Sequence, residues 1–328
     1  MRATEQVPLG RTPLRVTRLG LGTAPLGGLF AAVGDDQARG AVERAWDLGL
    51  RWFDTAPLYG SGLSEQRLGA ALRPHARDEY VLATKVGRLL RPSGSGRPGG
   101  QDFWGEGTGL DPVFDFSATA TRRSLEESLE RLGLGRVDVL HVHDPDEHHR
   151  EAVEGALPEL VRMRAEGTIG AVSAGMNQAP LLAALVREAD LDCVLLAGRY
   201  TLLDQSGLGE LLPACVERGV AVLAGGVFNS GLLADPRPGA RFDYRPTDAA
   251  TLARALALQE VCARHGVPLA AAALQFPLGH PAVATVVVGA RSAQEVATNV
   301  ELFELEIPGA LWADLRRAGL LPDEVPTP

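Results

Sequence analysis

The chain has 328 residues, of which 45% are apolar and 22% charged, and its 32 basic and 41 acidic side chains give a formal net charge of −9. This composition is typical of a folded globular protein, so it excludes intrinsic disorder, collagen-like repeats and small disulfide-stabilised scaffolds. The acidic balance, without a stripe of Lys and Arg, argues against nucleic acids and anionic membranes as main partners, because both need a concentrated positive field. A small-molecule partner fits better.

The three cysteines, Cys193, Cys215 and Cys262, lie far apart in apolar stretches. This spacing predicts buried thiols rather than a metal knuckle or a C-x-x-C redox pair. The first residues lead into no apolar signal-peptide core, and no later apolar run has the length that a spanning helix needs. We therefore expect a cytoplasmic protein.

From about residue 15 onward, short apolar runs alternate with longer segments of helical period, a pattern typical of βαβ units around a parallel sheet. The predicted helices are 35–48, 64–72, 118–132, 150–166, 179–189, 208–218, 248–265 and 293–303. The eight predicted strands are 19–23, 52–55, 80–86, 137–143, 169–173, 193–197, 220–224 and 285–288. This count predicts an α/β fold, a (β/α)8 TIM barrel that forms a single domain over residues 1–328.

A doubly wound open sheet is the alternative fold. It would carry a glycine fingerprint after the first strand, but that segment has Pro25 where the third glycine belongs. A G-x-G-x-x-G string does occur at 94–99, yet no predicted strand leads into it and no predicted helix follows it. The barrel is therefore favoured.

Two segments interrupt the repeat, at about 88–116 and 225–247. Both follow a predicted strand, which places them on the face where barrel enzymes keep their sites. Solvated insertions are the simple explanation. Their aromatic residues favour a lid over a pocket instead.

Polar residues at the carboxyl ends of the strands are the candidates for catalysis in a barrel. Asp54 and Tyr59 follow the second predicted strand, Lys85 lies near the end of the third, and His143 ends the fourth. Singly, each has a structural alternative: a turn cap, a packed aromatic ring, a rim charge or a core imidazole. Their convergence from three adjacent strands favours a catalytic site.

This group suits proton transfer coupled to hydride transfer. We predict that the Lys85 ammonium lowers the pKa of the Tyr59 phenol and that Asp54 holds Lys85. His143 would then hydrogen-bond the substrate oxygen whose proton Tyr59 exchanges. None of these side chains carries a hydride, so a nicotinamide cofactor is implied.

The motif at 52–60, Trp-Phe-Asp-Thr-Ala-Pro-Leu-Tyr-Gly, resembles the D-T-A-x-x-Y-G motif of the aldo-keto reductase superfamily, and the similarity runs nearly end to end. By motif, that family's catalytic tetrad falls on the four residues above. Segments 85–92, 141–146, 174–178 and 195–203 are similar to bacterial sugar dehydrogenases of the L-fucose or D-threo-aldose 1-dehydrogenase type, with pyridoxal 4-dehydrogenase as a near relative.

The resemblance implies oxidation of the anomeric carbon of an aldose to a lactone, by NAD(P)-dependent hydride transfer. A pyridoxal 4-dehydrogenase and a general aldehyde or ketone reductase are the enzymatic alternatives. A noncatalytic nicotinamide-binding regulatory subunit, as occurs among relatives, is the alternative of another class. Phe103 and Trp104 are the predicted substrate contacts, although they could pack equally on a pyranose or on the pyridoxal ring.

The resemblance also implies a dinucleotide extended across the barrel mouth. Asn177 would hold the carboxamide and Tyr200 would stack on the nicotinamide ring, while Leu195 stands where the family has a glutamine. The segment at 225–232 matches the pyrophosphate loop, and 289–299 the adenosine end. The residues predicted to contact the cofactor are Asn177, Tyr200, Gly226, Val227, Phe228, Asn229, Gly231, Gly289, Ala290, Arg291, Glu295 and Asn299.

The preferred cofactor is predicted to be NAD, with NADP possible. The carboxylate of Glu295 would repel a 2′-phosphate and accept a hydrogen bond from a free 2′-hydroxyl, although Arg291 could pair with a phosphate.

A metal site is the remaining alternative, because His141 and His143 share one face of a strand, as in barrel metallohydrolases. Strands five, six and eight end on Ser173, Ala197 and Gly289, which supply no His or carboxylate ligand. No metal is therefore predicted.

Overall fold

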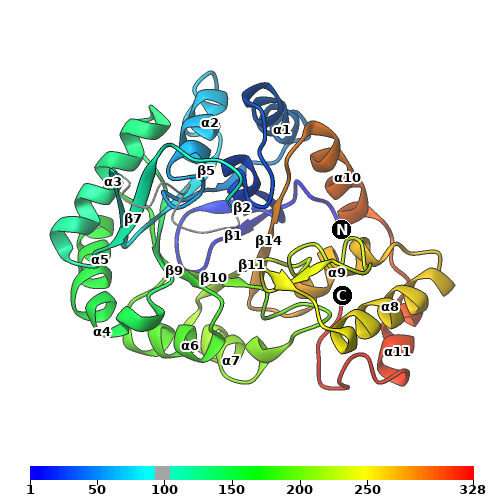
Figure 1. The fold of residues 1–328 in the computed structure, drawn as a ribbon. Helices are drawn as coiled ribbons and strands as arrows, with labels where there is room; N and C mark the ends of the chain where they lie inside the picture. The colour runs from blue at the N-terminus through cyan, green and yellow to red at the C-terminus, as the bar shows by residue number, and fades with distance from the viewer. Residues whose placement is uncertain (93–103) are drawn as a thin grey trace.

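The computed structural model describes residues 1–92 and 104–328. In these ranges eight parallel strands close into a barrel with helices outside it (Figure 1). The predicted (β/α)8 fold is confirmed. In order around the barrel the strands are β3 (Leu19–Gly22), β4 (Trp52–Asp54), β5 (Val81–Val86), β8 (Val139–His143), β9 (Ala171–Met176), β10 (Cys193–Ala197), β11 (Ala221–Gly225) and β14 (Val283–Gly289), which pairs with β3.

The barrel interior is a packed core. Inward-facing side chains such as Trp52, Val139 and Leu223 are fully buried there. An antiparallel hairpin, β1 (Gln6–Pro8) with β2 (Arg15–Thr17), adds Val7, Leu9 and Val16 to the same cluster. Because this end of the barrel is covered, chemistry belongs at the carboxyl ends of the strands.

Most of the longer helices around the barrel bury an apolar stripe on the side that faces the strands. Helix α3, for example, begins after Ser117, whose hydroxyl accepts a hydrogen bond from the N–H of Ala120, and ends at Gly133 with φ +63°. No helix of the described ranges is both long and apolar enough to cross a bilayer. The helices are α1 (Asp35–Asp47), α2 (Leu63–Leu72), α3 (Ala118–Leu132), α4 (His149–Glu151), α5 (Leu157–Ala165), α6 (Ala179–Glu188), α7 (Leu211–Arg218), α8 (Ala249–Arg264), α9 (Leu269–Gln275), α10 (Ala293–Glu304) and α11 (Gly309–Arg317).

One helical prediction was wrong in detail, and one helix was not predicted. The segment predicted as one helix over 150–166 is α4 and α5 joined by a π-helical turn, Ala152–Ala156. The proline at 158 explains the wider turn, because proline has no N–H and its ring clashes with the carbonyl four residues earlier. Helix α8 packs outside against α11, while the almost entirely buried α9 lies between α8 and α10 (Figure 1). Because α9 is apolar on every face, it shows no helical period in the sequence.

The two interrupting segments contain short strands that the sequence pattern did not predict. The first holds β6 (Arg88–Pro92) paired antiparallel with β7 (Leu110–Phe114). The second holds a two-residue pair, β12 (Arg241–Phe242) with β13 (Arg245–Pro246). Both segments follow the carboxyl end of a barrel strand, so they border the barrel mouth.

Candidate active site

The structure brings the four predicted catalytic residues together at the barrel mouth. Lys85 Nζ donates to Asp54 Oδ1 at 2.6 Å and to the carbonyl of Thr55 at 2.8 Å. It also lies over the Tyr59 ring, 4.9 Å from the ring centroid. The ring of Tyr59 meets the His143 imidazole nearly edge-on, with the centroids 5.9 Å apart.

Tight backbone packing fixes the position of Tyr59. Gly60 follows it with φ +60°, a conformation that glycine adopts readily. Gly27 packs against the same segment so closely that a Cβ there would lie 2.5 Å from the carbonyl carbon of Tyr59. The two glycines therefore let the Tyr59 loop fold down onto the mouth.

The electrostatics of Tyr59 differ from the prediction. Burial, followed by the nearby charges of Asp54 and Asp144, raises the pKa of Tyr59 well above its usual value, while Arg88 opposes this. The expected lowering of the Tyr59 pKa by Lys85 is therefore not found. The ammonium is already paired with Asp54, so its field at the phenol is largely cancelled. Tyr59 is a protonated phenol at neutral pH.

His143 lies beside a charged pair that the sequence analysis did not single out. Arg88 Nη2 donates to Asp144 Oδ2 at 2.7 Å, and the same oxygen lies 3.6 Å from His143 Nε2. Burial, with help from Arg88 and Lys85, holds the pKa of His143 well below its usual value, so the imidazole is neutral. Asp144 directly follows the end of β8 and Arg88 closely follows β5, so the strand-end rule could have found both.

The half of the mouth opposite the catalytic strands is lined by glycine. Gly22, Gly175, Gly225 and Gly289 lie at or next to the carboxyl ends of β3, β9, β11 and β14. A Cβ at Gly225 would meet the Leu195 side chain at 3.2 Å, and one at Gly22 would meet Val287 at 3.1 Å, so both positions face inward. These glycines leave room for the side chains of neighbouring strands, such as Leu195 and Val287, to pack against the backbone at the mouth.

The loop after β11 is a tightly coiled turn. Asn229, Ser230 and Gly231 have φ of +46°, +59° and +98° in succession, and Gly226 has φ +62°. The N–H groups of Asn229 and Gly231 donate to the carbonyls of Gly226 and Phe228, so the turn holds its own shape. Asn229 is buried, donates to the carbonyl of Gly198 at 3.2 Å, and its Oδ1 has no hydrogen-bond partner among the described residues.

Asn177 and Tyr200, both predicted cofactor contacts, lie in different environments. Asn177 follows β9 and donates to the carbonyl of Ala197 at 2.8 Å, which places its amide at the mouth. The ring of Tyr200 is 2% exposed and packs against Phe276 and His280, with centroids 5.2 and 5.8 Å apart. This packing holds the Tyr200 ring within the core, where it has no exposed face for the predicted stacking on a nicotinamide ring.

At the predicted adenosine end, Arg291 and Glu295 bind one another. The guanidinium of Arg291 lies 3.0 Å from the Glu295 carboxylate, which also accepts the backbone N–H of Arg291 at 2.9 Å. Ser292 caps α10 by accepting from the N–H of Glu295. Ala290 and Gly289 precede this turn, and Asn299 lies one helical turn beyond Glu295.

The aromatic wall predicted for the substrate is partly described. Trp104 lies 5.9 Å from the Tyr59 ring, centroid to centroid, and its backbone pairs with Leu29. Nearby, Glu106 accepts hydrogen bonds from Arg67 Nη1 at 2.7 Å and from the N–H of Val33 at 2.9 Å. Phe103 lies outside the described residues.

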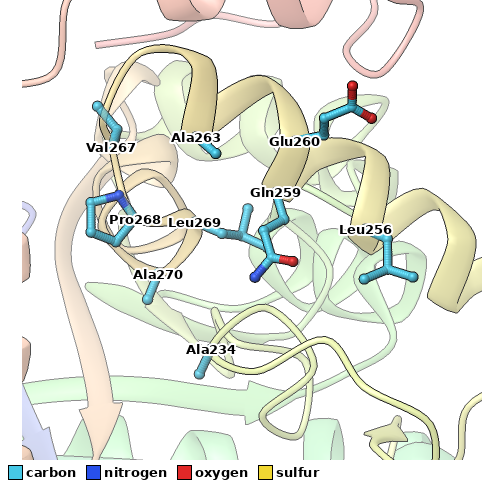
Figure 2. A pocket seen from close by; sticks show the side chains of 9 residues that line it. All are labelled: Ala234, Leu256, Gln259, Glu260, Ala263, Val267, Pro268, Leu269 and Ala270. Carbon is cyan, nitrogen blue, oxygen red and sulfur yellow. The ribbon is translucent and has the colours of Figure 1, made fainter.

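A separate cavity of about 450 Å³ lies between α8, the start of α9 and the loop after β11 (Figure 2). Its lining is mostly apolar and includes no catalytic residue. Among the described residues, no group of three His, Cys, Asp or Glu side chains is arranged to hold a metal ion. The lining residues are Ala234, Leu256, Gln259, Glu260, Ala263, Val267, Pro268, Leu269 and Ala270.

Known proteins share this arrangement. The chain is 45% identical over 315 residues to a D-threo-aldose 1-dehydrogenase from Pseudomonas sp, which covers 94% of this chain and 96% of that protein. It is 44% identical to a pyridoxal 4-dehydrogenase from Microbacterium luteolum, covering 98% and 99%, and 33% identical to an L-galactose dehydrogenase from Arabidopsis thaliana, covering 94% and 91%. An aldo-keto reductase structure from Bacillus halodurans in its holo form superposes with a TM-score of 0.76 at 25% identity, covering 96% of each chain.

The family comparison agrees with the geometry. The sequence profile of the aldo/keto reductase family matches residues 18–319. Members of this family are NAD(P)-dependent oxidoreductases, and a barrel with a Tyr, Lys, Asp and His at its mouth is suited to that chemistry. The chain belongs to the aldo/keto reductase family.

Proposed function

We propose that the protein oxidises the anomeric carbon of an aldose of the L-fucose or D-threo type to a lactone, with NAD as the hydride acceptor. The observation that carries the proposal is the site geometry, in which Tyr59, Lys85 and His143 converge at the barrel mouth of a chain that is 45% identical to a D-threo-aldose 1-dehydrogenase. The family match and the amide of Asn177 at the mouth support a bound dinucleotide at the other half of the mouth.

In the oxidation, the C1–H bond of the cyclic hemiacetal breaks with its electron pair and the hydroxyl proton leaves the C1 oxygen. When bound, the nicotinamide supplies the carbon that accepts the hydride. Tyr59 takes the proton from the hydroxyl, and neutral His143 donates a hydrogen bond to the same oxygen. Lys85, fixed by its ion pair with Asp54, packs against one face of the Tyr59 ring and so keeps the phenol in position for the substrate.

A sugar substrate fits the charged pair beside His143. Asp144 offers carboxylate oxygens that accept from hydroxyl groups, and Arg88 fixes that carboxylate in place. Burial raises the pKa of Asp144, with Arg88 opposing, so the group is poorly hydrated and gains from new hydroxyl partners. A polyhydroxylated ring satisfies such groups better than an aromatic ring does.

Asn177, the loop residues Gly226 to Gly231 and the first turn of α10 would hold the dinucleotide. Glu295 supports NAD over NADP, because its carboxylate occupies Arg291, the nearby cation that a 2′-phosphate would need. Leu195 lies inside the barrel between Gly175 and Gly225, so it contributes only apolar contact where the family has a glutamine.

The test is formation of reduced nicotinamide by the purified protein at mildly alkaline pH. L-fucose, D-arabinose, L-galactose and pyridoxal are compared, each with NAD and then with NADP. Turnover of a sugar with NAD, and lactone in the product, is the expected result. Turnover of pyridoxal alone would replace the sugar proposal with the activity named for the Microbacterium relative.

The Asp144→Asn variant makes the comparison sharper. It keeps the shape of the side chain and removes its charge. Because the Asp144 charge also raises the pKa of Tyr59, both substrates are affected, and the readout is the ratio of kcat/KM for the sugar to that for pyridoxal, which should fall about tenfold. If no substrate reacts although NAD binds, reduction of other aldehydes and ketones is tested next, and failure of that reaction too would favour a nicotinamide-binding regulatory subunit.

A further inference from the structure

Buried polar side chains continue from the catalytic residues across the barrel interior. Asp54 on β4, His141 on β8, Ser173 on β9 and Cys193 on β10 are at most 3% exposed. The strand register sets His141 beside Lys85 on one side and Ser173 on the other. Barrel interiors are usually filled by branched apolar residues, so polar groups at this depth require partners.

The imidazole of His141 bridges two of these groups. Its Nδ1 lies 2.7 Å from Ser173 Oγ, and its Nε2 lies 3.3 Å from Asp54 Oδ2. Neither Nε2 nor Oδ2 has a regular hydrogen bond to any residue in the described ranges. Two buried polar atoms that face each other in this way are best satisfied by each other.

The protonation of His141 follows from its surroundings. The groups that face it are Asp54, Lys85, Ser173, Cys193 and, on its own strand, His143. Burial, against the opposing effect of Asp54, lowers the pKa of His141, so the ring is neutral and carries one proton. With that proton on Nε2, the ring donates to the carboxylate and accepts from the Ser173 hydroxyl. With the proton on Nδ1, a lone pair would face a carboxylate oxygen.

We propose that His141, held as the Nε2–H tautomer by Ser173, is a positioning residue for the Asp54–Lys85 pair. It binds the Asp54 oxygen that Lys85 leaves unused, and so fixes the carboxylate that holds Lys85 beneath Tyr59. This role rests on the proton-transfer function proposed for Tyr59, but not on the identity of the substrate. His141 itself touches neither substrate nor cofactor.

The test compares His141→Leu, His141→Gln and Ser173→Ala with the wild type by pH profiles of kcat and KM. Asp54 raises the pKa of Tyr59, and the hydrogen bond from His141 offsets part of that charge. His141→Leu should therefore lower kcat about tenfold and move the alkaline rise in oxidation upward by about half a pH unit, with KM little changed. His141→Gln keeps a donor and should restore most of kcat, and Ser173→Ala should fall between.

Val139→Ala is the matched control, because Val139 is buried on the same face of β8, two residues earlier, and lies in the apolar interior cluster. It should lower the melting temperature without moving the pH profile. A profile unmoved in His141→Leu, or moved equally in Val139→Ala, would reduce His141 to a packing residue.

A second measurement does not depend on turnover or on any variant that must fold. Nitrogen NMR of the wild-type protein with labelled histidine distinguishes the two neutral tautomers. His141 should carry its proton on Nε2 throughout the neutral range, and a proton on Nδ1 overturns the proposal. If no substrate reacts, the proposed function fails while this measurement still decides the tautomer.

Discussion

Lys85 Nζ lies over the face of the Tyr59 ring, 4.9 Å from its centroid, and makes its shortest contact with Asp54 Oδ1 at 2.6 Å. The negative charge of Asp54 therefore offsets most of the effect of the Lys85 ammonium on the phenol. Because burial and two carboxylates surround Tyr59, its pKa is raised rather than lowered. The protein alone therefore favours Tyr59 as a proton donor, and as a base it needs alkaline conditions.

The phenol of Tyr59 is predicted to be essential for both directions of the reaction. Tyr59→Phe removes the only proton-transferring atom of this ring, so kcat should fall by about two to four orders of magnitude. Tyr80→Phe is the matched control, because Tyr80 is also a buried phenol and its hydroxyl has no partner among the described residues. Steady-state kinetics of the two variants, with cofactor binding measured by fluorescence, decide the matter. Near wild-type turnover in Tyr59→Phe would contradict the mechanism.

The pH dependence should have opposite signs in the two directions. Since the pKa of Tyr59 lies above its usual value, the phenol is protonated at neutral pH. Oxidation requires the deprotonated form and should rise with pH throughout the alkaline range. Reduction of the corresponding carbonyl requires the protonated form and should not rise. Initial rates in both directions, across buffers of equal ionic strength, test this, and an oxidation rate that is flat in alkali is the contrary result.

A clamp beneath Trp104 is predicted to control substrate affinity. Arg67 is 9% exposed and binds both Glu106, at 25%, and Asp35, at 84%. Glu106→Ala should loosen the segment that carries Trp104 and raise KM for the substrate severalfold, up to about tenfold, with kcat nearly unchanged. Asp35→Asn breaks the exposed pair of the same arginine and should leave KM as it is. Equal effects from the two variants would show that Trp104 is held by other contacts.

The sequence was sufficient for the barrel and for the catalytic residues because both follow from short-range patterns. Strand periodicity located β4, β5 and β8, and their carboxyl ends then identified Asp54, Lys85 and His143. Which of these side chains contact one another depends on strand register and stagger, and a local sequence pattern does not predict either. For this reason the reversed shift of the Tyr59 pKa, which arises from burial and then from the nearby charges of Asp54 and Asp144, could be obtained only from the structure.

Other features were hidden for specific physical reasons. Helix α9 is buried on nearly every face, so it has no period to detect. Tyr200 follows a strand end, yet Phe276, far along the chain, holds its ring in the core. His141 was weighed only as a metal ligand, because its partner Ser173 lies on a neighbouring strand and became visible only through the register.

The choice between the two cofactors is predicted to depend on the pair formed by Arg291 and Glu295. Glu295→Gln removes the charge that occupies the Arg291 guanidinium, which lies 3.0 Å away, and keeps a side chain able to cap α10. The freed guanidinium can then bind a 2′-phosphate, so the ratio of kcat/KM for NADP to that for NAD should rise about tenfold.

Glu301→Gln is the control for this prediction, because Glu301 is exposed on the same helix and its substitution changes the net charge equally. The ratio should stay constant in this variant, and in Glu295→Gln its rise should shrink as salt screens the exposed guanidinium. If Glu295→Gln leaves the ratio unchanged at low salt, the first turn of α10 does not contact the 2′-phosphate or 2′-hydroxyl of the cofactor. The preference for NAD then has another origin.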